Sequence, residues 1–379
     1  MTSKLLTTIP YEDGFVMPGE FEPQTDVWLL MAHDMTSWHN GGFPARAHQK
    51  AIIEGINKAG THVNLGVPHH LYLEAERLYD GMNVTLYEMS SNDCWARDSG
   101  AIYVKNRETG EIRAVDFKFN AWGGEQRGCT GCYLDYTKDD TVGRKMAQIS
   151  GVDRYRSTFI LEGGAITVDG EGTLITTESC LLNPNRNPDL TREEIEQQLH
   201  DYLGIEKVIW LKEGVDTDDG ETDGHVDDVC GFIAPGEVVC CYTEDTDNIY
   251  YEVFKECYET LCEAVDAKGR KLKVHKIPAA KPFLFNAEEA ENILPTQGLA
   301  HDPDGTWREE GDHAVPSYGN FLITNGAIIL PVYGLESDQE AIDAFREIVD
   351  GRFEVIPVPA HNIALGGGSV HCITQQVPA

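Results

Sequence analysis

The sequence predicts an α/β fold in which five units of hairpin, helix and strand form a closed ring. Three observations lead to this prediction. Turn signals that contain glycine recur along the chain, most of the hairpins they mark precede a helical pattern, and the helical patterns lead to apolar strands. A ring closed by pairing its first and last strands would expose no sheet edge. No linker or low-complexity tract divides the 379 residues, so we expect one domain over 1–379.

The first unit has a strand, a helix and a strand, but no hairpin. These elements are predicted at 27–31, 45–58 and 62–67. A fourth segment, the strand predicted at 369–374, could supply the missing partner. Pairing of segments so far apart in the sequence would close the ring.

Four hairpins follow. Their turns are predicted at 108–110, 169–170, 235–236 and 325–326. The Asn325-Gly326 turn is the strongest signal, because both residues tolerate the positive φ of a type I′ turn. The clearest flanking strands are predicted at 101–105 with 112–119, 158–168 with 173–177, and 320–324 with 327–332.

The best-defined helix begins at a capping box formed by Thr191 and Glu194 and ends at Gly204. A strand at 207–211 follows it. Similar helix and strand pairs are predicted at 250–265 with 272–276 and at 338–349 with 353–358, and a weaker helix at 139–149.

Composition limits the possible partners. Lys and Arg number 30 against 63 Asp and Glu, a formal net charge of −33. Such acidity repels polyanions, so we expect no nucleic acid and no membrane surface as partner, whereas a small cation would be attracted. The acidity could also serve solubility alone. The sequence shows no signal-peptide pattern, no run of eighteen apolar residues and no disulfide framework among its ten cysteines, so we expect a cytoplasmic protein.

The residues able to carry chemistry fall at related places in the predicted units. Asp98 precedes the first strand of one hairpin, Glu162 lies within the first strand of the next, and His225 and Asp227 begin the third. Cys372 lies in the predicted closing strand. At strand periodicity His225 and Asp227 would point to one face. In a ring, these positions would converge near the axis.

Two metal sites have to be considered. Residues 219–224 match the first half of a calcium-binding EF-hand loop, but the twelfth position is Cys230 and not Glu. Cys129 and Cys132 could form half of a zinc site or a redox motif, but no second pair with suitable spacing exists. We therefore expect neither a metal nor another cofactor.

Five ordered motifs resemble those of agmatine deiminases, which belong with the bacterial peptidylarginine deiminases in the guanidino-group-modifying superfamily. They are NDCWARDSG at 92–100, FNAWGG at 119–124, LEGG at 161–164, ETDGHVDD at 221–228 and GGGSVHCITQQ at 366–376. The resemblance extends from Met17 to the end of the sequence. It implies a five-bladed α/β propeller with its active site on the pseudo-fivefold axis, which agrees with the predicted ring.

The resemblance also implies roles for the candidate residues. Cys372 corresponds to the nucleophile, Asp98 and Asp227 to the carboxylates that grip a guanidinium, His225 to the general acid and base, and Glu162 to the residue that orients the histidine. These residue types suit the reaction, because a delocalised guanidinium is a poor electrophile until carboxylates fix it. A thiol with a pKa of about 8.5 also needs a nearby cation to ionise at neutral pH.

Three further residues are expected to contact the substrate. Trp95 would supply an aromatic wall and Glu221 would meet the far end of the substrate, which is an ammonium group in agmatine, although both could serve only the structure of their loops. Gly368 lies in a triple glycine whose backbone amides could approach a ligand closely.

The implied activity is hydrolysis of agmatine to N-carbamoylputrescine and ammonia through an amidino-cysteine intermediate. Departures from the family pattern at residues 31–34, at Asp223 and at Ser369 leave the substrate open to other guanidines, such as arginine or peptidyl arginine. The activity could also be that of an amidinotransferase, and a propeller of this kind can be non-catalytic. A homo-oligomer is possible.

Overall fold

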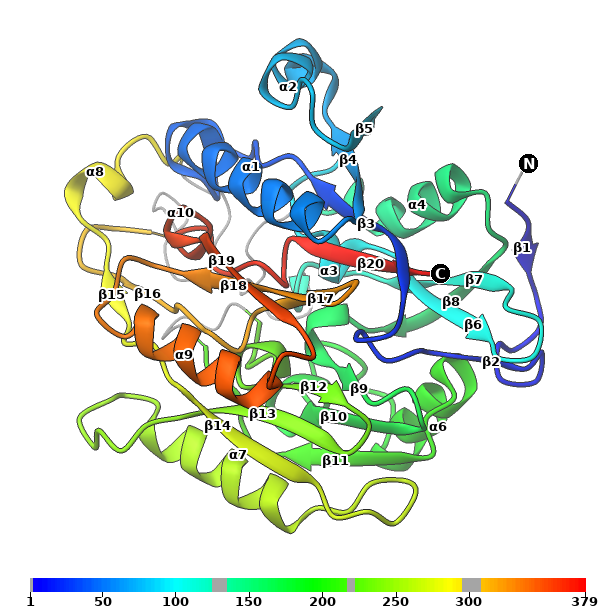
Figure 1. The fold of residues 1–379 in the computed structure, drawn as a ribbon. Coiled ribbons are helices and arrows are strands. Elements are labelled where there is room, and N and C mark those ends of the chain that lie inside the picture. Colours follow the sequence, from blue (N-terminus) through cyan, green and yellow to red (C-terminus); the bar gives the residue numbers. More distant parts are fainter. Residues whose placement is uncertain (1–2, 125–134, 217–221, 295–307) are drawn as a thin grey trace.

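The structure is a computed structural model, and it describes residues 3–124, 135–216, 222–294 and 308–379. Its fold is mixed α/β. Within the described ranges, five sheets have three or more strands each. Figure 1 shows helices α1, α4, α6, α7 and α9 towards the outside of these sheets. A small additional sheet pairs β15 (Phe283–Leu284) with β16 (His313–Ala314).

Three of the sheets repeat the predicted order of hairpin, helix and strand. In each, two antiparallel hairpin strands are followed by a helix and then by a strand parallel to the second one. The elements are β9 (Thr167–Val168), β10 (Thr173–Thr177), α6 (Arg192–Leu203) and β11 (Lys207–Leu211); β12 (Cys230–Ala234), β13 (Glu237–Tyr242), α7 (Tyr251–Glu263) and β14 (Lys273–Pro278); and β17 (Leu322–Thr324), β18 (Ala327–Val332), α9 (Asp338–Val349) and β19 (Glu354–Pro359).

Local signals in these units are confirmed. The Thr191 side chain accepts a hydrogen bond from the Glu194 amide while the Glu194 side chain accepts one from the Thr191 amide, so α6 begins with a capping box. Its buried face carries Ile195, Leu199 and Leu203. Asn325 and Gly326 have φ of 35° and 83°, as the β17–β18 turn requires.

The fourth unit corrects one boundary. Its sheet runs β1 (Leu5–Leu6), β8 (Arg154–Ile160), β7 (Ile112–Lys118), β6 (Ile102–Asn106) and β2 (Phe15–Val16), and α4 (Val142–Ser150) precedes β8. The single strand predicted at 158–168 is therefore wrong. The chain leaves β8 at Ile160, makes the 3₁₀ turn η5 (Gly163–Ala165) and then enters β9. Gly163 permits this turn, because a Cβ there would lie 2.4 Å from the Arg97 carbonyl oxygen.

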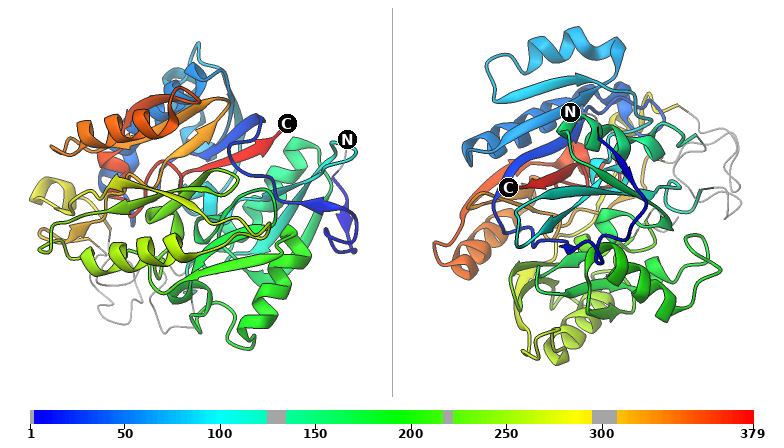
Figure 2. Two further views of the ribbon diagram at one scale, coloured as in Figure 1. Left: turned by 60° about the horizontal axis from the view of Figure 1, so that its bottom comes forward. Right: turned by 90° about the vertical axis from the view of Figure 1, so that its right-hand side faces the viewer.

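The fifth sheet joins segments from opposite ends of the sequence. Its order is β20 (Thr374–Pro378), β3 (Gln24–Leu30), β4 (His62–Val67) and β5 (Val84–Glu88), with α1 (Phe43–Lys58) between β3 and β4. β20 pairs antiparallel with β3, and Figures 1 and 2 show the red strand beside the blue one. The predicted pairing is confirmed, but the strand lies later than predicted, because residues 370–373 form a turn and β20 begins at Thr374.

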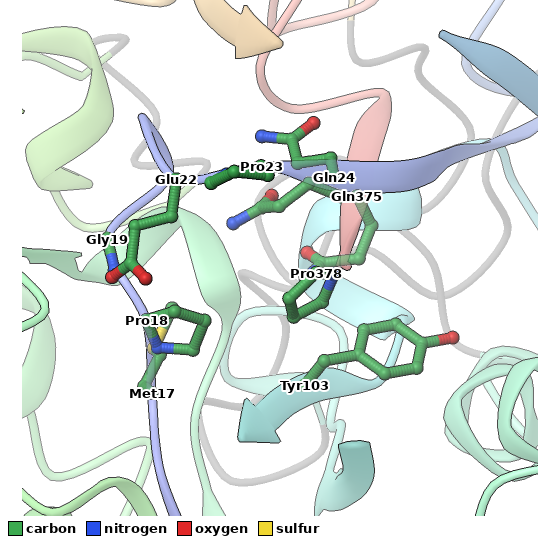
Figure 3. A pocket seen from close by; sticks show the side chains of 10 residues that line it. Met17, Pro18, Gly19, Glu22, Pro23, Gln24, Tyr103, Gln375 and Pro378 are labelled. Carbon is green, nitrogen blue, oxygen red and sulfur yellow. The ribbon is translucent and has the colours of Figure 1, made fainter. Parts of the chain in front are cut away.

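The segment before β3 also packs against β20. Met17, Pro18 and Gly19 line a cavity of about 10 Å³ together with Gln375 and Pro378 (Figure 3). Among the described residues, no helix combines the length and apolar character needed to cross a bilayer.

Candidate active site

Cys372 lies in the turn immediately before β20, and Asn320 holds it there. The Asn320 side-chain oxygen accepts hydrogen bonds from the amides of His371 (2.9 Å) and Cys372 (3.2 Å). The Asn320 amide group donates to the Cys372 Sγ over 3.0 Å. Asn320 is fully buried just before β17, so the hairpin of one sheet fixes the sulfur delivered by another.

Three other predicted residues meet around Gly164. A Cβ at this position would lie 2.6 Å from Nδ1 of His225, 2.9 Å from Oδ1 of Asp98 and 3.0 Å from Oδ2 of Asp227. The Gly164 amide donates to Asp98 Oδ1 (3.1 Å), and Asp227 Oδ2 lies 3.8 Å from the Cys372 Sγ. The structure thus brings Asp98, His225, Asp227 and Cys372 together, although they come from different sheets.

Short turns, and not strands, present these side chains. Asp98 lies in the one-turn helix α3 (Ala96–Ser99), and Glu162 directly precedes η5. His225 precedes the 3₁₀ turn η6 (Val226–Asp228), which contains Asp227. The predictions that Glu162 and Cys372 lie within strands, and that His225 and Asp227 share a strand face, are therefore wrong. The short helix α3 and the turn η6, and not a shared strand face, bring Asp98, His225 and Asp227 close to Gly164.

A buried arginine neutralises Glu162. Arg186 and Glu162 have no exposed side-chain surface, and Arg186 Nε donates to Glu162 Oε1 over 2.7 Å. Arg186 Nη1 donates to Asp223 Oδ2 (2.6 Å), and Nη2 donates to the Thr222 carbonyl (3.0 Å). Asp223, one of the departures from the family pattern, therefore shares the charge of Arg186 with Glu162.

On the other side of Asp227, a histidine bridges two carboxylates. His371 Nδ1 lies 2.8 Å from Asp227 Oδ2, and Nε2 lies 2.8 Å from Glu20 Oε2. Burial and Arg97 act to lower the pKa of His371, but the Glu20 charge and both hydrogen bonds outweigh them and raise it. A carboxylate oxygen faces each ring nitrogen, so the geometry and the raised pKa both favour the doubly protonated imidazolium form.

The electrostatics of the site oppose ionisation of Cys372. Burial raises the pKa of the thiol well above its ordinary value, and the carboxylates of Asp227, Asp228 and Asp98 act in the same direction. Burial also raises the pKa of Asp98, against the opposing effect of His225. The free site therefore holds a thiol among carboxylates, and a cation placed between them would favour the thiolate.

Aromatic side chains border the sulfur. A Cβ at Gly368 would lie 2.5 Å from the Trp95 ring and 3.1 Å from the Cys372 Sγ. Glycine is therefore required at this position, where the Trp95 ring and the Cys372 sulfur approach the backbone. Trp122 packs edge-on against Trp95 and donates from Nε1 to Asp98 Oδ2 over 3.0 Å. The Trp95 ring thus lies beside the loop that leads to Cys372, and its contact with a substrate stays a prediction.

Several predictions fall elsewhere. Glu221 and the pair Cys129 and Cys132 lie outside the described residues. Two groups of described side chains have donor atoms within 4.8 Å of one another and could hold a metal ion: Glu162, Cys180 and His225, and Asp227, Asp228 and Cys372. The absence of a metal therefore stays a prediction.

Sequence reasoning missed Asn320, Arg186, His371, Glu20 and Trp122. A signal was present for two of them, because His371 is adjacent to Cys372 and Trp122 lies in one of the motifs. The other three lie outside the quoted motifs. Glu20, for example, is 351 residues from its partner His371.

Comparisons with known proteins show the family of the chain. Residues 16–378 match the family of Porphyromonas-type peptidyl-arginine deiminases. The chain is 44% identical to a putative agmatine deiminase of Streptococcus mutans and 42% identical to one of Enterococcus faecalis, with 100% of each chain covered. A solved structure of the Enterococcus faecalis agmatine deiminase superposes with a TM-score of 0.92 at 42% identity, with 99% of both chains covered. A substrate-bound cysteine-to-serine variant of the C. jejuni agmatine deiminase gives a TM-score of 0.77 at 25% identity over 96% of both chains.

Proposed function

The chain belongs to the Porphyromonas-type peptidyl-arginine deiminase family, and from that premise we propose that it is an agmatine deiminase, which hydrolyses agmatine to N-carbamoylputrescine and ammonia. The observation that carries the proposal is the meeting of Asp98, His225 and Asp227 around Gly164, next to the Cys372 sulfur. Full-length relatives and solved structures that carry this activity in their names support it.

Asp98 and Asp227 receive the planar guanidinium. Asp227 Oδ1 is buried and has no hydrogen-bond partner among the described residues, so it is available to accept an N–H of the substrate. The cation would also offset the carboxylates that raise the pKa of Cys372. Substrate binding then favours the thiolate, with the thiol proton passing to His225.

In the first half of the reaction, the Cys372 sulfur attacks the guanidinium carbon and forms a C–S bond. The carbon becomes tetrahedral. His225 then returns the proton to one terminal nitrogen, the C–N bond breaks and ammonia leaves. Cys372 remains joined to the substrate as an amidino-thioether, and no electron acceptor is consumed.

In the second half, water attacks the amidino carbon while His225 takes a proton from it. The C–S bond breaks, the thiolate recovers a proton from His225, and a ureido product is released. Glu162 orients His225 in this scheme. Their nearest donor atoms lie within 4.8 Å, and Glu162 is itself fixed by Arg186.

We also propose that the five main sheets are the blades of a five-bladed propeller, built as one domain over residues 1–379. Four of the sheets combine a hairpin with a strand that pairs parallel to it, and in the fifth β20 takes the place of the missing hairpin strand. Residues from different sheets gather at the site, as they would at a propeller axis. Cytoplasmic location, a cofactor-free reaction and a possible homo-oligomer complete the proposal.

The test is steady-state ammonia release from agmatine, arginine, a peptidyl arginine and a simple alkylguanidine. Agmatine should give the highest kcat/KM, and Cys372→Ala should abolish release of ammonia from it. Turnover of another guanidine without agmatine would refute the substrate and keep the mechanism. Full activity in Cys372→Ala would refute the mechanism.

Two controls separate deimination from competing chemistries. Adding an amine acceptor should not change the product, because an amidinotransferase would pass the amidine to the amine and form a new guanidine. Dialysis against a chelator should leave kcat unchanged, whereas a loss restored by a divalent metal would contradict a cofactor-free reaction.

A further inference from the structure

Another buried carboxylate, that of Asp93, lies close to the site but takes no part in the proposed reaction. It has no exposed surface, and each of its oxygens accepts a hydrogen bond from a different indole. Trp38 Nε1 donates to Oδ1 over 2.7 Å, and Trp95 Nε1 donates to Oδ2 over 2.9 Å. One carboxylate therefore fixes two tryptophan rings.

The shared acceptor sets how the two rings lie. The indoles of Trp38 and Trp95 are stacked, with centroids 5.4 Å apart and planes 26° apart. The loop that carries Asp93 is also held, because the Asn92 and Asp93 amides donate to Asp139. The rings are thus positioned from an anchored segment, and rotating either one would leave a buried oxygen of Asp93 without that donor.

Both rings press on the triple glycine that precedes the nucleophile. A Cβ at Gly366 would lie 2.1 Å from the Trp38 ring, and one at Gly368 would lie 2.5 Å from the Trp95 ring. The same Gly368 Cβ would be 3.0 Å from Cβ of Cys372. The loop therefore has no room to move towards the indoles, whose six-membered rings limit its path to Cys372.

The pKa of Asp93 is unusual for an aspartate whose hydrogen bonds hold two tryptophan side chains in place. Burial and the nearby Asp34 raise its pKa to about 7, although hydrogen bonds from Trp38 and Ser37 oppose the shift. A hydrophobic residue would avoid this desolvation. Retention of a buried carboxylate here is explained by the need for two acceptor oxygens on one rigid group.

We propose that Asp93 is a positioning residue for the nucleophile: through the paired indoles of Trp38 and Trp95 it fixes the glycine loop and thereby the direction of the Cys372 sulfur. The proposal rests on the proposed function for the role of Cys372. It assigns Asp93 no contact with the substrate.

The test is Asp93→Asn, which keeps the shape but leaves one oxygen for two indole donors. We expect kcat for agmatine to fall roughly ten- to a hundredfold, because a misplaced nucleophile costs this much even when binding survives. KM should change little. The matched control is Asp169→Asn, since Asp169 is equally buried but caps the turn between β9 and β10 through the Glu171 and Thr173 amides.

A second readout does not depend on agmatine. Alkylation of Cys372 is followed by peptide mass spectrometry with neutral iodoacetamide and with cationic chloroacetamidine, whose amidinium the Asp98 and Asp227 carboxylates would align. The ratio of the cationic to the neutral rate should fall about tenfold in Asp93→Asn, because the sulfur would no longer face the aligned reagent. It should stay at the wild-type value in Asp169→Asn.

A third variant tests the path through the loop. Gly366→Ala puts a methyl group into the Trp38 ring and should lower kcat as Asp93→Asn does. Trp38→Phe removes the outer indole ring, so Gly366→Ala with Trp38→Phe should be more active than the product of the single effects predicts.

A wild-type kcat and alkylation ratio in Asp93→Asn would overturn the proposal. Additive effects of Gly366→Ala and Trp38→Phe, or a lowered melting temperature as the sole change in Asp93→Asn, would overturn it as well. If the wild-type protein does not hydrolyse agmatine, the proposed function fails on its own, and the alkylation ratio still decides the role of Asp93.

Discussion

The site contains two carboxylate regions that differ in how they meet a guanidinium. In the first, Glu162 and Asp223 hold the guanidinium of Arg186, and all three of its nitrogens donate hydrogen bonds, to Glu162, Asp223 and the Thr222 carbonyl. In the second, Asp98 and Asp227 receive an indole, a backbone amide and histidines. Within the described residues, no arginine or lysine pairs with either of these two carboxylates.

The first region contains a permanent cation, Arg186, and we call it the permanent region. The second, around Asp98 and Asp227, would hold a cation only while a substrate is bound, and we call it the transient region. Arg186 compensates its carboxylates at all times, so that region is fixed before any ligand arrives. Asp98 and Asp227 have only histidines as cationic partners, and His371 divides its charge between Asp227 and Glu20. Under the proposed function, a guanidinium substrate would complete the compensation of these buried carboxylates. The two regions use the same pairing chemistry, once for structure and once for binding.

The largest effect should come from the transient region. Asp227→Asn removes a charge that, under the proposed function, receives the substrate, so kcat/KM for agmatine should fall by about a hundredfold or more. Folding should be preserved, because the loss of the ion pair with His371 is offset by the loss of repulsion between Asp227 and the carboxylates of Asp98 and Asp228. Steady-state kinetics and a thermal melt measure both. Asp343→Asn, at an exposed position, is the control, and an active Asp227→Asn would mean that the guanidinium binds elsewhere.

A substitution in the permanent region should lower the free energy of unfolding. Arg186→Met leaves Glu162 and Asp223 buried without their cation, which should cost about 3–5 kcal/mol of unfolding free energy. Arg192→Met is the matched control, because Arg192 pairs with Glu178 at 38% exposure on both sides and should contribute at most about 1 kcal/mol. Urea denaturation compares them. Equal losses in the two variants would contradict a structural role for the buried pair.

The smallest of the three effects should come from His371, as a pH dependence of the free energy of unfolding. Its pKa is raised in the folded protein, so its stabilising contribution is complete below the unfolded value of about 6.5 and is lost as pH rises through the folded value. The deficit of His371→Gln in unfolding free energy should therefore be larger at pH 6 than at pH 9. Glu20→Gln should weaken this dependence, since the Glu20 charge raises the pKa. A deficit independent of pH would show that the ring is neutral.

Local signals predicted the units but not the turns that carry the site. Periodicity and capping at Thr191 or Asn325-Gly326 identify elements because those rules act within a few residues. The 3₁₀ turns that carry the site have no period, so Glu162, His225 and Asp227 were assigned to strands. Cys372 was placed inside a strand for the same reason.

Contacts between residues far apart in the sequence set the other limit on what the sequence predicts. The residues that position the site, such as Arg186 against Glu162 and Asn320 against Cys372, are chosen by packing between sheets. A single sequence does not report such partners, because an arginine or asparagine in a loop is usually exposed. The resemblance motifs supplied the candidate reacting residues, and the structure was needed to find the residues that hold them in place.

The pairing of β20 with β3 has a consequence for biosynthesis. Leu29 pairs with Thr374, which the ribosome adds 345 residues later. At roughly 5–20 residues per second, the edge of β3 waits some tens of seconds for its neighbour. During that interval β3 presents an open edge that chaperones would have to shield. Cys372 lies in the turn directly before this strand, so the proposed nucleophile would not be in place before β20 has been synthesised and has paired with β3.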